Sequence, residues 1–340
     1  MPIDIVVDGM GSDRAPESEI RGAILACRDY DVRVHLVGPE EVLRPALTRA
    51  LRAPRWPGTA APEIEIVHSS EWISMDDKAA QAVRAKRDSS MRVGLRMVRD
   101  GAAAGFFTAG NTGAAMATAK LVLGMLAGVH RPALATILPT ITGDPSLLLD
   151  VGANVDCEAD NLRQFAVMGN MYARHVLRIA QPRLGLLSIG EEESKGNQLT
   201  RDTFPLLRDL AGIDFIGNVE GRDLFNGRAD VAVCDGFVGN VALKSIEGAA
   251  KLISVLLRES LKSTVTSQVG ALLSRKAFND FKKRLDYSEY GGAPLLGVRG
   301  VTIVGHGSSN EKAVMNGIRV AAEFAQAEVN SHIEAALRVP

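Results

Sequence analysis

Cysteine is scarce in this sequence. Only three of its 340 residues are cysteine, and none forms a Cys-x-x-Cys pair or a cysteine/histidine spacing typical of a zinc site. Secreted domains that depend on disulfides usually carry an even and denser set of cysteines. We therefore expect a reducing, cytoplasmic location and no metal site.

Long apolar runs and an excess of charge of one sign are also absent. No run reaches the roughly 18 residues that a membrane-spanning helix needs, and the N-terminus lacks the pattern of a signal peptide. The net charge is −1, which gives no reason to expect nucleic-acid binding. With 46% hydrophobic and 23% charged residues, the chain can bury a large core.

One pattern repeats along the chain: a short apolar run, a loop rich in glycine, asparagine, aspartate or serine, and a helix-compatible segment. At least six predicted strands end in this way. The alternation predicts an α/β fold with a mostly parallel sheet, whose strand ends carry the ligand-binding loops. Because helix starts offer free N–H groups and a positive dipole end, we expect an anionic substrate.

Residues 184–240 contain three of these units, and we expect the other loops to be brought to them. Lys195, placed between Gly190 and Gly196, is a point charge suited to binding phosphate. The alternative is an ordinary surface lysine. Ser194 and Asn197 flank it, and Asn197 is either a hydrogen-bond donor to the substrate or a helix cap.

Other strand-end loops supply further candidates. His306 stands among glycines before a helix and is expected to orient phosphate or donate a proton, or else to be a plain loop residue. Asp8 and Asp235 are expected to order loops, since like charges repel an anion. The remaining candidates for substrate binding, with helix capping or close packing as the alternatives, are Asn111, Thr112, Gly113, Asn154, Gly239 and Asn240. The loop that holds Asn154 also resembles a cation site weakly, with fewer ligands than a calcium loop.

Residues 74–100 are predicted to be helical and are strongly basic. Two interpretations stay open: a solvated helical face, or a docking surface for an acidic partner. The basic residues are Arg84, Lys86, Arg87, Arg92, Arg96 and Arg99.

Residues 251–290 break the strand–helix alternation and combine apolar residues at helical spacing with eight Lys and Arg. Such a basic amphipathic segment indicates a membrane-surface element or an oligomer contact. The alternative is a helix packed on its own core. The apolar residues proposed for the contact are Val269, Leu272, Leu273, Phe278 and Phe281.

Five loop motifs together resemble the PlsX family of bacterial phosphate acyltransferases, which act in phospholipid synthesis. The resemblance runs essentially from end to end of the chain. Two positions depart from the family pattern: Ser12 stands where a second glycine is expected, and Ile189 where an asparagine is expected. The motifs lie at residues 8–11, 109–114, 149–156, 190–197 and 234–240.

The resemblance implies transfer of a long-chain acyl group from acyl carrier protein to inorganic phosphate, without a cofactor. The acyl phosphate would then pass to a membrane glycerol-3-phosphate acyltransferase. It also implies a homodimer at the inner face of the cell membrane. The implied fold is a three-layer α/β/α sandwich like that of isopropylmalate dehydrogenases and phosphotransacetylases, with residues 1–340 as one catalytic domain and 251–290 as a helical protrusion.

The residues agree with this chemistry, because phosphate is itself the nucleophile. A thiol leaving group, with a pKa near ~8.5, needs little acid assistance, and no Ser-His-Asp or Cys-His unit stands out. Positioning and electrostatics would then dominate catalysis. The alternatives are a phosphotransacetylase using acyl-CoA, a membrane scaffold, or an NAD-dependent dehydrogenase, although Arg14 replaces the third glycine of a dinucleotide fingerprint.

Overall fold

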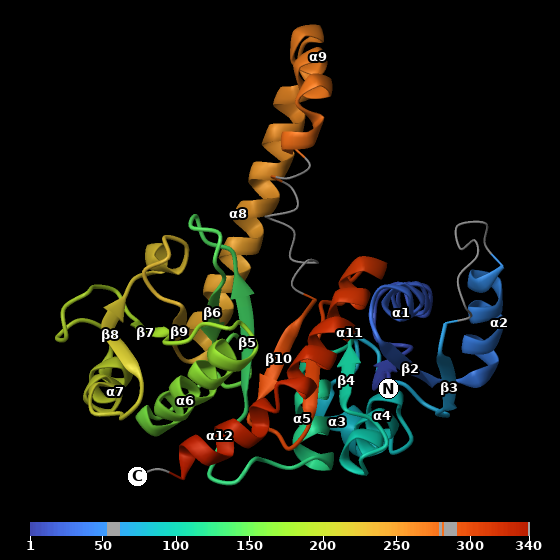
Figure 1. Cartoon of the computed structure of the whole chain (residues 1–340), viewed down its shortest axis with the longest axis horizontal. Helices are drawn as coiled ribbons and strands as arrows, with labels where there is room; N and C mark the ends of the chain where they lie inside the picture. The colour runs from blue at the N-terminus through green and yellow to red at the C-terminus, as the bar shows by residue number, and fades with distance from the viewer. Residues whose placement is uncertain (53–61, 279–280, 282–290, 339–340) are drawn as a thin grey trace.

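The computed structural model describes residues 1–52, 62–278, 281 and 291–338. Its eleven strands form one sheet in the order β3-β2-β1-β4-β11-β10-β5-β6-β9-β7-β8 (Figure 1). The strands are β1 Ile3–Asp8, β2 Val32–Gly38, β3 Ile64–His68, β4 Gly105–Thr108, β5 Ala133–Leu138, β6 Ser146–Leu149, β7 Arg183–Leu187, β8 Asp214–Val219, β9 Val231–Val233, β10 Ala293–Leu296 and β11 Val301–Val304.

Helices cover both faces of this sheet. They are α1 Glu17–Asp29, α2 Glu40–Leu51, α3 Ala79–Ala85, α4 Ser90–Arg99, α5 Thr112–Val122, α6 Ala159–His175, α7 Gln198–Arg208, α8 Gly236–Lys262, α9 Val265–Leu273, α11 Glu311–Gln326 and α12 Val329–Leu337.

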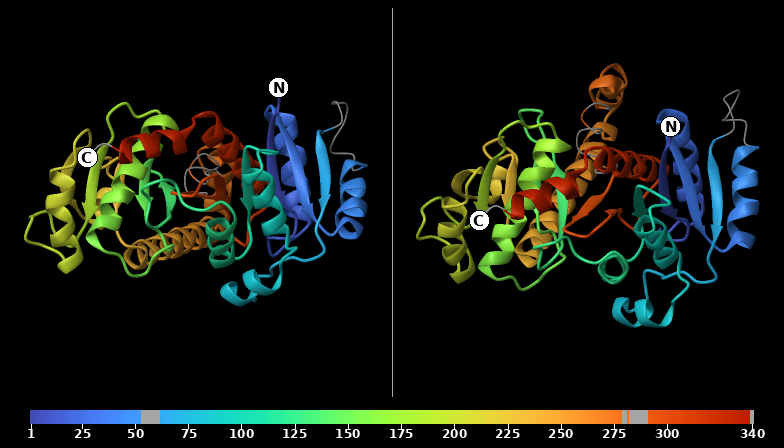
Figure 2. Two further views of the ribbon diagram at one scale, coloured as in Figure 1. Left: turned by 90° about the horizontal axis from the view of Figure 1, so that it is seen from below. Right: turned by 60° about the horizontal axis from the view of Figure 1, so that its bottom comes forward.

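Alternate strand residues point into two separate cores, one on each face. In β1, Ile5 and Val7 belong to the core on the face covered by α1 and α11, whereas Val6 belongs to the core on the face covered by α4. Figure 2 shows the resulting layers from two further directions. The predicted α/β fold with a mostly parallel sheet is confirmed.

Strand direction divides the sheet into two parallel halves. One half contains β1, β2, β3, β4 and β11, and the other contains β6, β7, β8 and β9. Between them, β10 runs antiparallel to β11 and to β5, and β5 runs antiparallel to β6. Three reversals leave the halves pointing in opposite directions. We call the edge at the carboxyl ends of the β1 half the first edge, and that of the β6 half the second edge.

The six predicted strand–loop–helix units are present, as β1–α1, β4–α5, β6–α6, β7–α7, β9–α8 and β11–α11. At four of these helix starts a side chain accepts a hydrogen bond from a backbone N–H of the first turn. These N-caps are Asn111, Asn197, Asp235 and Asn310. Local sequence thus defines where these helices begin.

Two predicted helical regions differ in detail from the structure. Residues 74–100 form two helices, α3 and α4, because the chain turns at residues 86–89. The protrusion expected at residues 251–290 begins earlier, since α8 is continuous from Gly236 to Lys262. At a rise of about 1.5 Å per residue this helix is roughly 40 Å long, and with α9 it projects from the body (Figure 1). Residues 279–280 and 282–290 of that prediction lie outside the described part of the chain.

Candidate active site

Three loops at the first edge are tied together by hydrogen bonds. Thr108 Oγ1 donates to Asp8 Oδ2 at 2.8 Å and accepts from Gly110 N at 3.0 Å, which joins the loops after β1 and β4. Asp13 N donates to Gly307 O at 2.8 Å, which adds the loop after β11. The loops approach so closely that a Cβ on Gly11 would lie 2.9 Å from Gly110 N. Asp8 therefore orders this edge, as predicted.

Two buried carboxylates lie beneath these loops. Burial raises the pKa of Asp8, and it raises the pKa of Glu19 to about 7. Glu19 Oε1 accepts from Ser12 N at 2.9 Å, and its Oε2 is buried with no hydrogen-bond partner among the described residues. The backbone of the β1–α1 loop thus depends on an acid that is largely withdrawn from water.

Asn111, Thr112 and Gly113 lie at the start of α5, on this edge. The Asn111 side chain caps the helix by accepting from Ala114 N at 3.0 Å, and it donates to the Met75 and Asp77 carbonyls at 3.3 and 3.0 Å. Both capping and loop ordering therefore engage this amide. Thr112 and Gly113 are half-buried, and a Cβ on Gly113 would lie 3.2 Å from the Ala79 Cβ of α3.

His306 is exposed on the same edge, in the β11–α11 loop. Its Nδ1 lies 2.8 Å from Ser308 Oγ and accepts from Ser308 N at 3.2 Å. The imidazole is thereby held close to the start of α11, where Asn310 caps the helix. The predicted phosphate-orienting histidine and the predicted Asn111 helix start thus share one edge.

The second edge is organised around Asp150. Burial raises the pKa of this carboxylate, which accepts from the backbone N–H groups of Leu134, Ala153 and Asn154 at 3.0, 3.0 and 2.7 Å. Asn154 Nδ2 donates to Asp150 Oδ2 at 2.9 Å and to Pro132 O at 2.7 Å. The loop's polar groups therefore bind one another. Nowhere in the described part do three His, Cys, Asp or Glu side chains gather as for a metal ion.

Gly239 and Asn240 open α8 beside this loop. A Cβ on Gly239 would lie 1.9 Å from Asp150 O, so the helix can contact the strand end only through glycine. Asn240 is exposed, and its side chain lies against Gly152. Asp235 caps α8 by accepting from Val238 N at 2.9 Å, which confirms its predicted ordering role.

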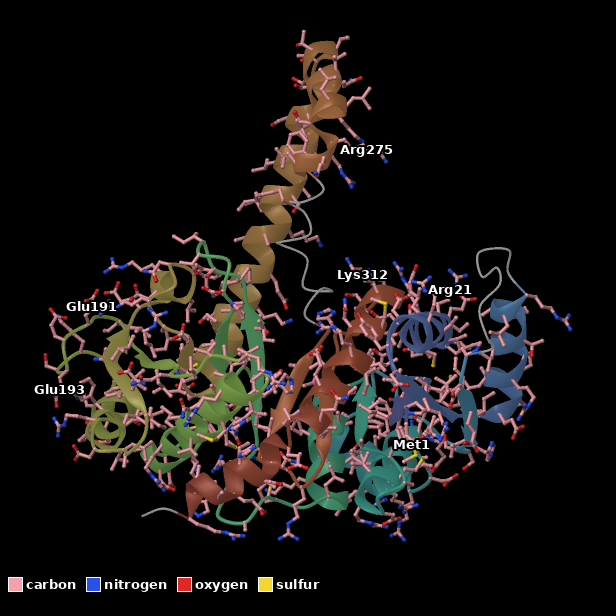
Figure 3. All side chains as sticks on the ribbon, in the orientation of Figure 1. Met1, Arg21, Glu191, Glu193, Arg275 and Lys312 are labelled. Carbon is pink, nitrogen blue, oxygen red and sulfur yellow. The ribbon has the colours of Figure 1, made fainter. Side chains whose placement is uncertain are left out.

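The loop between β7 and α7 carries Ser194, Lys195 and Asn197, all exposed. Asn197 caps α7 by accepting from Thr200 N at 2.9 Å. Two of the three neighbouring acids are paired with arginines: Glu191 with Arg228 at 2.7 Å and Glu193 with Arg208 at 3.4 Å. Among the described residues, the Lys195 ammonium has no carboxylate partner. Figure 3 shows Glu191 and Glu193 at the outer end of the molecule.

The structure does not bring all the predicted residues together. Asn111 and His306 lie on the first edge, whereas Asn154, Asn240 and Lys195 lie on the second. Six strand spacings of about 4.8 Å, or roughly 29 Å, separate β4 from β7. Lys195 therefore does not meet an anion at Asn111 of the same molecule, and contact between them would require a second copy of the chain.

The cysteines are poor nucleophiles in this structure. Burial raises the pKa of the Cys27 and Cys157 thiols to about 11, and it raises the pKa of the fully buried Cys234 thiol well above its ordinary value. A thiolate is the reactive form of cysteine. The thiols therefore have the structural character that the sequence suggested for Cys157 and Cys234.

Sequence reasoning missed Glu19 and Thr108. Glu19 reads as an acid in the first turn of a helix, which is common at a positive dipole end. Its one distinguishing signal is the spacing to Ala23 and Ala26, which places it on the buried stripe of α1. Thr108 ends an apolar strand, and only the fold shows that it faces Asp8 across 100 residues of sequence.

Comparison with known proteins identifies the family. Residues 3–332 match the model of a family described as fatty acid synthesis protein. The phosphate acyltransferase of Acidobacterium capsulatum is 68% identical over 340 residues, which cover 100% of this chain and 98% of that protein. The chain belongs to the phosphate acyltransferase family. The phosphate acyltransferase of Koribacter versatilis is 62% identical over 338 residues, 98% of this chain and 92% of that protein.

Membership of the phosphate acyltransferase family makes this protein an enzyme of acyl transfer. Solved structures of low identity share its fold. A phosphotransacetylase from Streptococcus pyogenes has a TM-score of 0.64 at 17% identity, covering 96% of this chain and 94% of that chain. A branched-chain phosphotransacylase from Enterococcus faecalis has a TM-score of 0.56 at 14% identity, covering 94% and 98%. The predicted phosphotransacetylase-like fold is confirmed.

Proposed function

We propose that this enzyme transfers a long-chain acyl group from acyl carrier protein to inorganic phosphate, with the whole chain acting as one catalytic domain. Phosphate attacks the thioester carbonyl, the acyl–sulfur bond breaks, and acyl phosphate and the carrier thiol are released. The reaction needs no cofactor. The acyl phosphate then serves phosphatidic acid synthesis through a membrane glycerol-3-phosphate acyltransferase.

The observation that carries the proposal is the set of loops at the first edge, fixed by Asp8 and by Asn111. Two capped helices, α5 and α11, begin there. Helix starts leave backbone N–H groups available to an anion, and their dipoles favour negative charge. A prearranged set of such donors suits both phosphate and the oxyanion that forms during attack.

The raised pKa values of the cysteine thiols support direct attack by phosphate, without an acyl-cysteine intermediate. The alternative mechanism is a covalent one with Ser308 as the nucleophile, because the His306 imidazole lies 2.8 Å from the Ser308 hydroxyl and is placed to activate it. Direct attack predicts no mass increase of the enzyme mixed with acyl-thioester alone. A stable acyl adduct lost on Ser308→Ala would establish the covalent route.

The assay that tests the proposal follows phosphate-dependent release of thiol from palmitoyl-acyl carrier protein and, in parallel, from palmitoyl-CoA. Hydroxylamine traps the acyl phosphate. We expect release from the carrier substrate and a clear preference for it. Preference for CoA would favour a phosphotransacetylase, and release from neither would overturn the proposal. A spectral response to NAD would then point to the dehydrogenase.

We also propose a homodimer formed through α8. Only Gly236 and Gly239 of its 27 residues are buried. Leu252 is 59% exposed, Val255 45% and Leu256 52%, and their spacing places them on one face. An apolar stripe of this length is unusual on a monomer surface, and a second copy of the same helix would cover it.

Association with the inner face of the cell membrane is proposed for α9. Val269, Leu272 and Leu273 are 52%, 70% and 83% exposed, and α9 contains no charged residue. Lys262 and Arg275 flank it. Apolar side chains between basic ones suit an anionic bilayer surface. None of the described helices is long and apolar enough to cross a membrane. Phe281 is 41% exposed, and Phe278 is half-buried.

A further inference from the structure

The surface over α3 and α4 carries several basic side chains that form no close ion pair with a described carboxylate. The exposed side chains of Arg84, Arg87 and Arg96 make no ion pair with another described residue. Exposed Lys78 and half-buried Arg92 likewise have no carboxylate partner in the described part of the chain. We call these five residues the α3–α4 basic surface.

Three acids in or next to this segment, Glu71, Asp77 and Asp88, form hydrogen bonds or an ion pair within it. Asp77 binds Lys86 and accepts from Ser74 N at 2.8 Å. Asp88 accepts from Ser70 N at 2.9 Å and Ser70 Oγ at 2.7 Å. Glu71 accepts from Asp88 N at 3.1 Å. Residues 74–100 contain seven Lys and Arg against Asp76, Asp77, Asp88 and Asp100. The segment therefore keeps an excess of three positive charges.

Two large apolar side chains are exposed in the segment that leads into α3. Trp72 is 42% exposed and Met75 44% exposed. Aromatic, methionine and arginine side chains are enriched at protein interfaces. The surface thus combines apolar anchors with long-range attraction for an acidic partner.

This surface adjoins the first edge directly. Asn111 Nδ2 donates to the Met75 and Asp77 carbonyls, and Gly113 packs against Ala79 of α3. On the other side, the Met75 Cε would lie 2.9 Å from a Cβ built on Gly307. A partner docked on α3 and α4 would therefore stand beside the loops that hold Asn111 and His306.

The proposed membrane contact, α9, lies at the opposite end of the molecule from α3 and α4. Figure 1 shows α9 at the tip of the projection and α3 and α4 on the far side of the body. A bilayer that receives α9 therefore leaves α3 and α4 facing away from it. That position suits a soluble partner rather than anionic lipid.

We propose that the α3–α4 basic surface docks the acidic face of acyl carrier protein and directs its acyl-bearing arm to the first edge. This inference rests on the proposed function. Electrostatic steering of this kind acts on the encounter with the carrier and leaves the chemical step unchanged.

The test compares two triple variants of the full-length enzyme. Arg84→Glu/Arg87→Glu/Arg96→Glu reverses three charges of the α3–α4 basic surface. Arg21→Glu/Arg49→Glu/Arg52→Glu makes the same change in net charge on α1 and at the end of α2, away from α3 and α4. We expect the first to lower kcat/KM for acyl-carrier protein about tenfold or more at low ionic strength, mainly through KM. The control triple is expected to change kcat/KM by less than about twofold. Added salt should narrow the difference in kcat/KM between the two triple variants, because it screens the charges.

Two further measurements distinguish a docking defect from a catalytic defect: turnover of palmitoyl-CoA and direct binding of the carrier protein. Turnover of palmitoyl-CoA should be equal in both variants, and carrier binding, measured by fluorescence anisotropy, should weaken only in the first. Equal effects of the two triples would overturn the docking site, as would loss of binding to anionic vesicles in place of carrier binding. If the wild-type enzyme binds carrier but forms no acyl phosphate, the proposed function fails while the docking result stands.

Discussion

Asp8 and Glu19 place two carboxylates under the loops of the first edge, almost wholly withdrawn from water. The pKa of Glu19 is raised to about 7 from 4.5, chiefly by desolvation, with Asp8 adding repulsion. Since the native pKa lies above the unfolded one, this acid's contribution to stability is complete below the unfolded pKa. It is lost as pH rises through the native pKa.

Glu19→Gln should remove this pH dependence. Between about pH 5 and pH 8 the wild type is expected to lose roughly 2–3 kcal/mol more unfolding free energy than the variant. Urea denaturation at the two pH values measures the difference. Glu17→Gln, at an exposed position of the same helix, serves as the control. Stability curves that run parallel for Glu19→Gln and wild type would contradict the assignment.

Lys195 is the exposed cation of the β7–α7 loop. Its charge is exposed while Glu191 and Glu193 are paired with arginines, so we expect Lys195→Ala to fold, to bind carrier protein and to lose most turnover. Lys195→Arg keeps the positive charge and should therefore retain part of the wild-type turnover. Steady-state kinetics measures the effect, and unchanged turnover in Lys195→Ala would remove this residue from the reaction.

Mixing two variants can determine whether Lys195 acts within its own chain or on a second copy of the chain. Equimolar Lys195→Ala and Asn111→Ala variants, refolded together, should regain part of the turnover if the two edges meet across two copies of the chain. No recovery would place the role of Lys195 within its own chain. The distance of roughly 29 Å between β4 and β7 makes this comparison informative.

At the scale of elements, glycine determines how α8 meets the sheet. Gly239 leaves no room for a side chain, since a Cβ would lie 1.9 Å from the Asp150 carbonyl oxygen, whereas Gly248 of the same helix has nothing within 4 Å. Gly239→Ala should therefore destabilise the protein by about 3 kcal/mol. Gly248→Ala should be neutral or stabilise by up to about 1 kcal/mol. Thermal unfolding of both variants measures the two changes in stability. Equal changes would show that the protein relieves the close contact at Gly239 at little cost.

Elements with strong local signals were predictable. Short stretches of neighbouring residues encode the apolar runs of β1, β5 and β11 and the caps of α5, α7 and α8. All of these elements and caps are present in the structure. Strand direction was not predictable in this way. β10 and β5 run antiparallel to their neighbours because of connections between distant parts of the chain. The candidate residues were therefore recognised one by one, while their division between two edges could not be foreseen.

At the scale of the whole molecule, the exposed stripe of α8 predicts the oligomeric state. Leu252→Glu/Leu256→Glu places charge in the proposed contact and should shift the protein from dimer to monomer. Light scattering after size-exclusion chromatography measures the mass. Leu121→Glu, an exposed apolar residue of α5, is the control. A wild-type monomer, or a dimer that survives the double change, would exclude this face of α8.

The tip of the projection gives a second prediction at this scale. Leu272→Ser/Leu273→Ser should lower binding to anionic phospholipid vesicles several-fold, because it removes apolar area that would enter the bilayer. Turnover of soluble substrate should stay within about twofold. Vesicle flotation measures the first quantity and the thiol-release assay the second. Vesicle binding that survives the change would place the membrane contact elsewhere.

The position of β11 has a consequence for how the protein is made. This strand pairs with β4, and α11 packs on α1 and β4, although β11 and α11 lie about 200 residues beyond β4 in the chain. A ribosome releasing the chain from its N-terminus delivers β1 to β4 long before the strand and helix that complete their layer. The first half of the sheet therefore waits, with an open edge at β4, until synthesis is almost finished, and that interval is when the nascent protein most needs protection from aggregation.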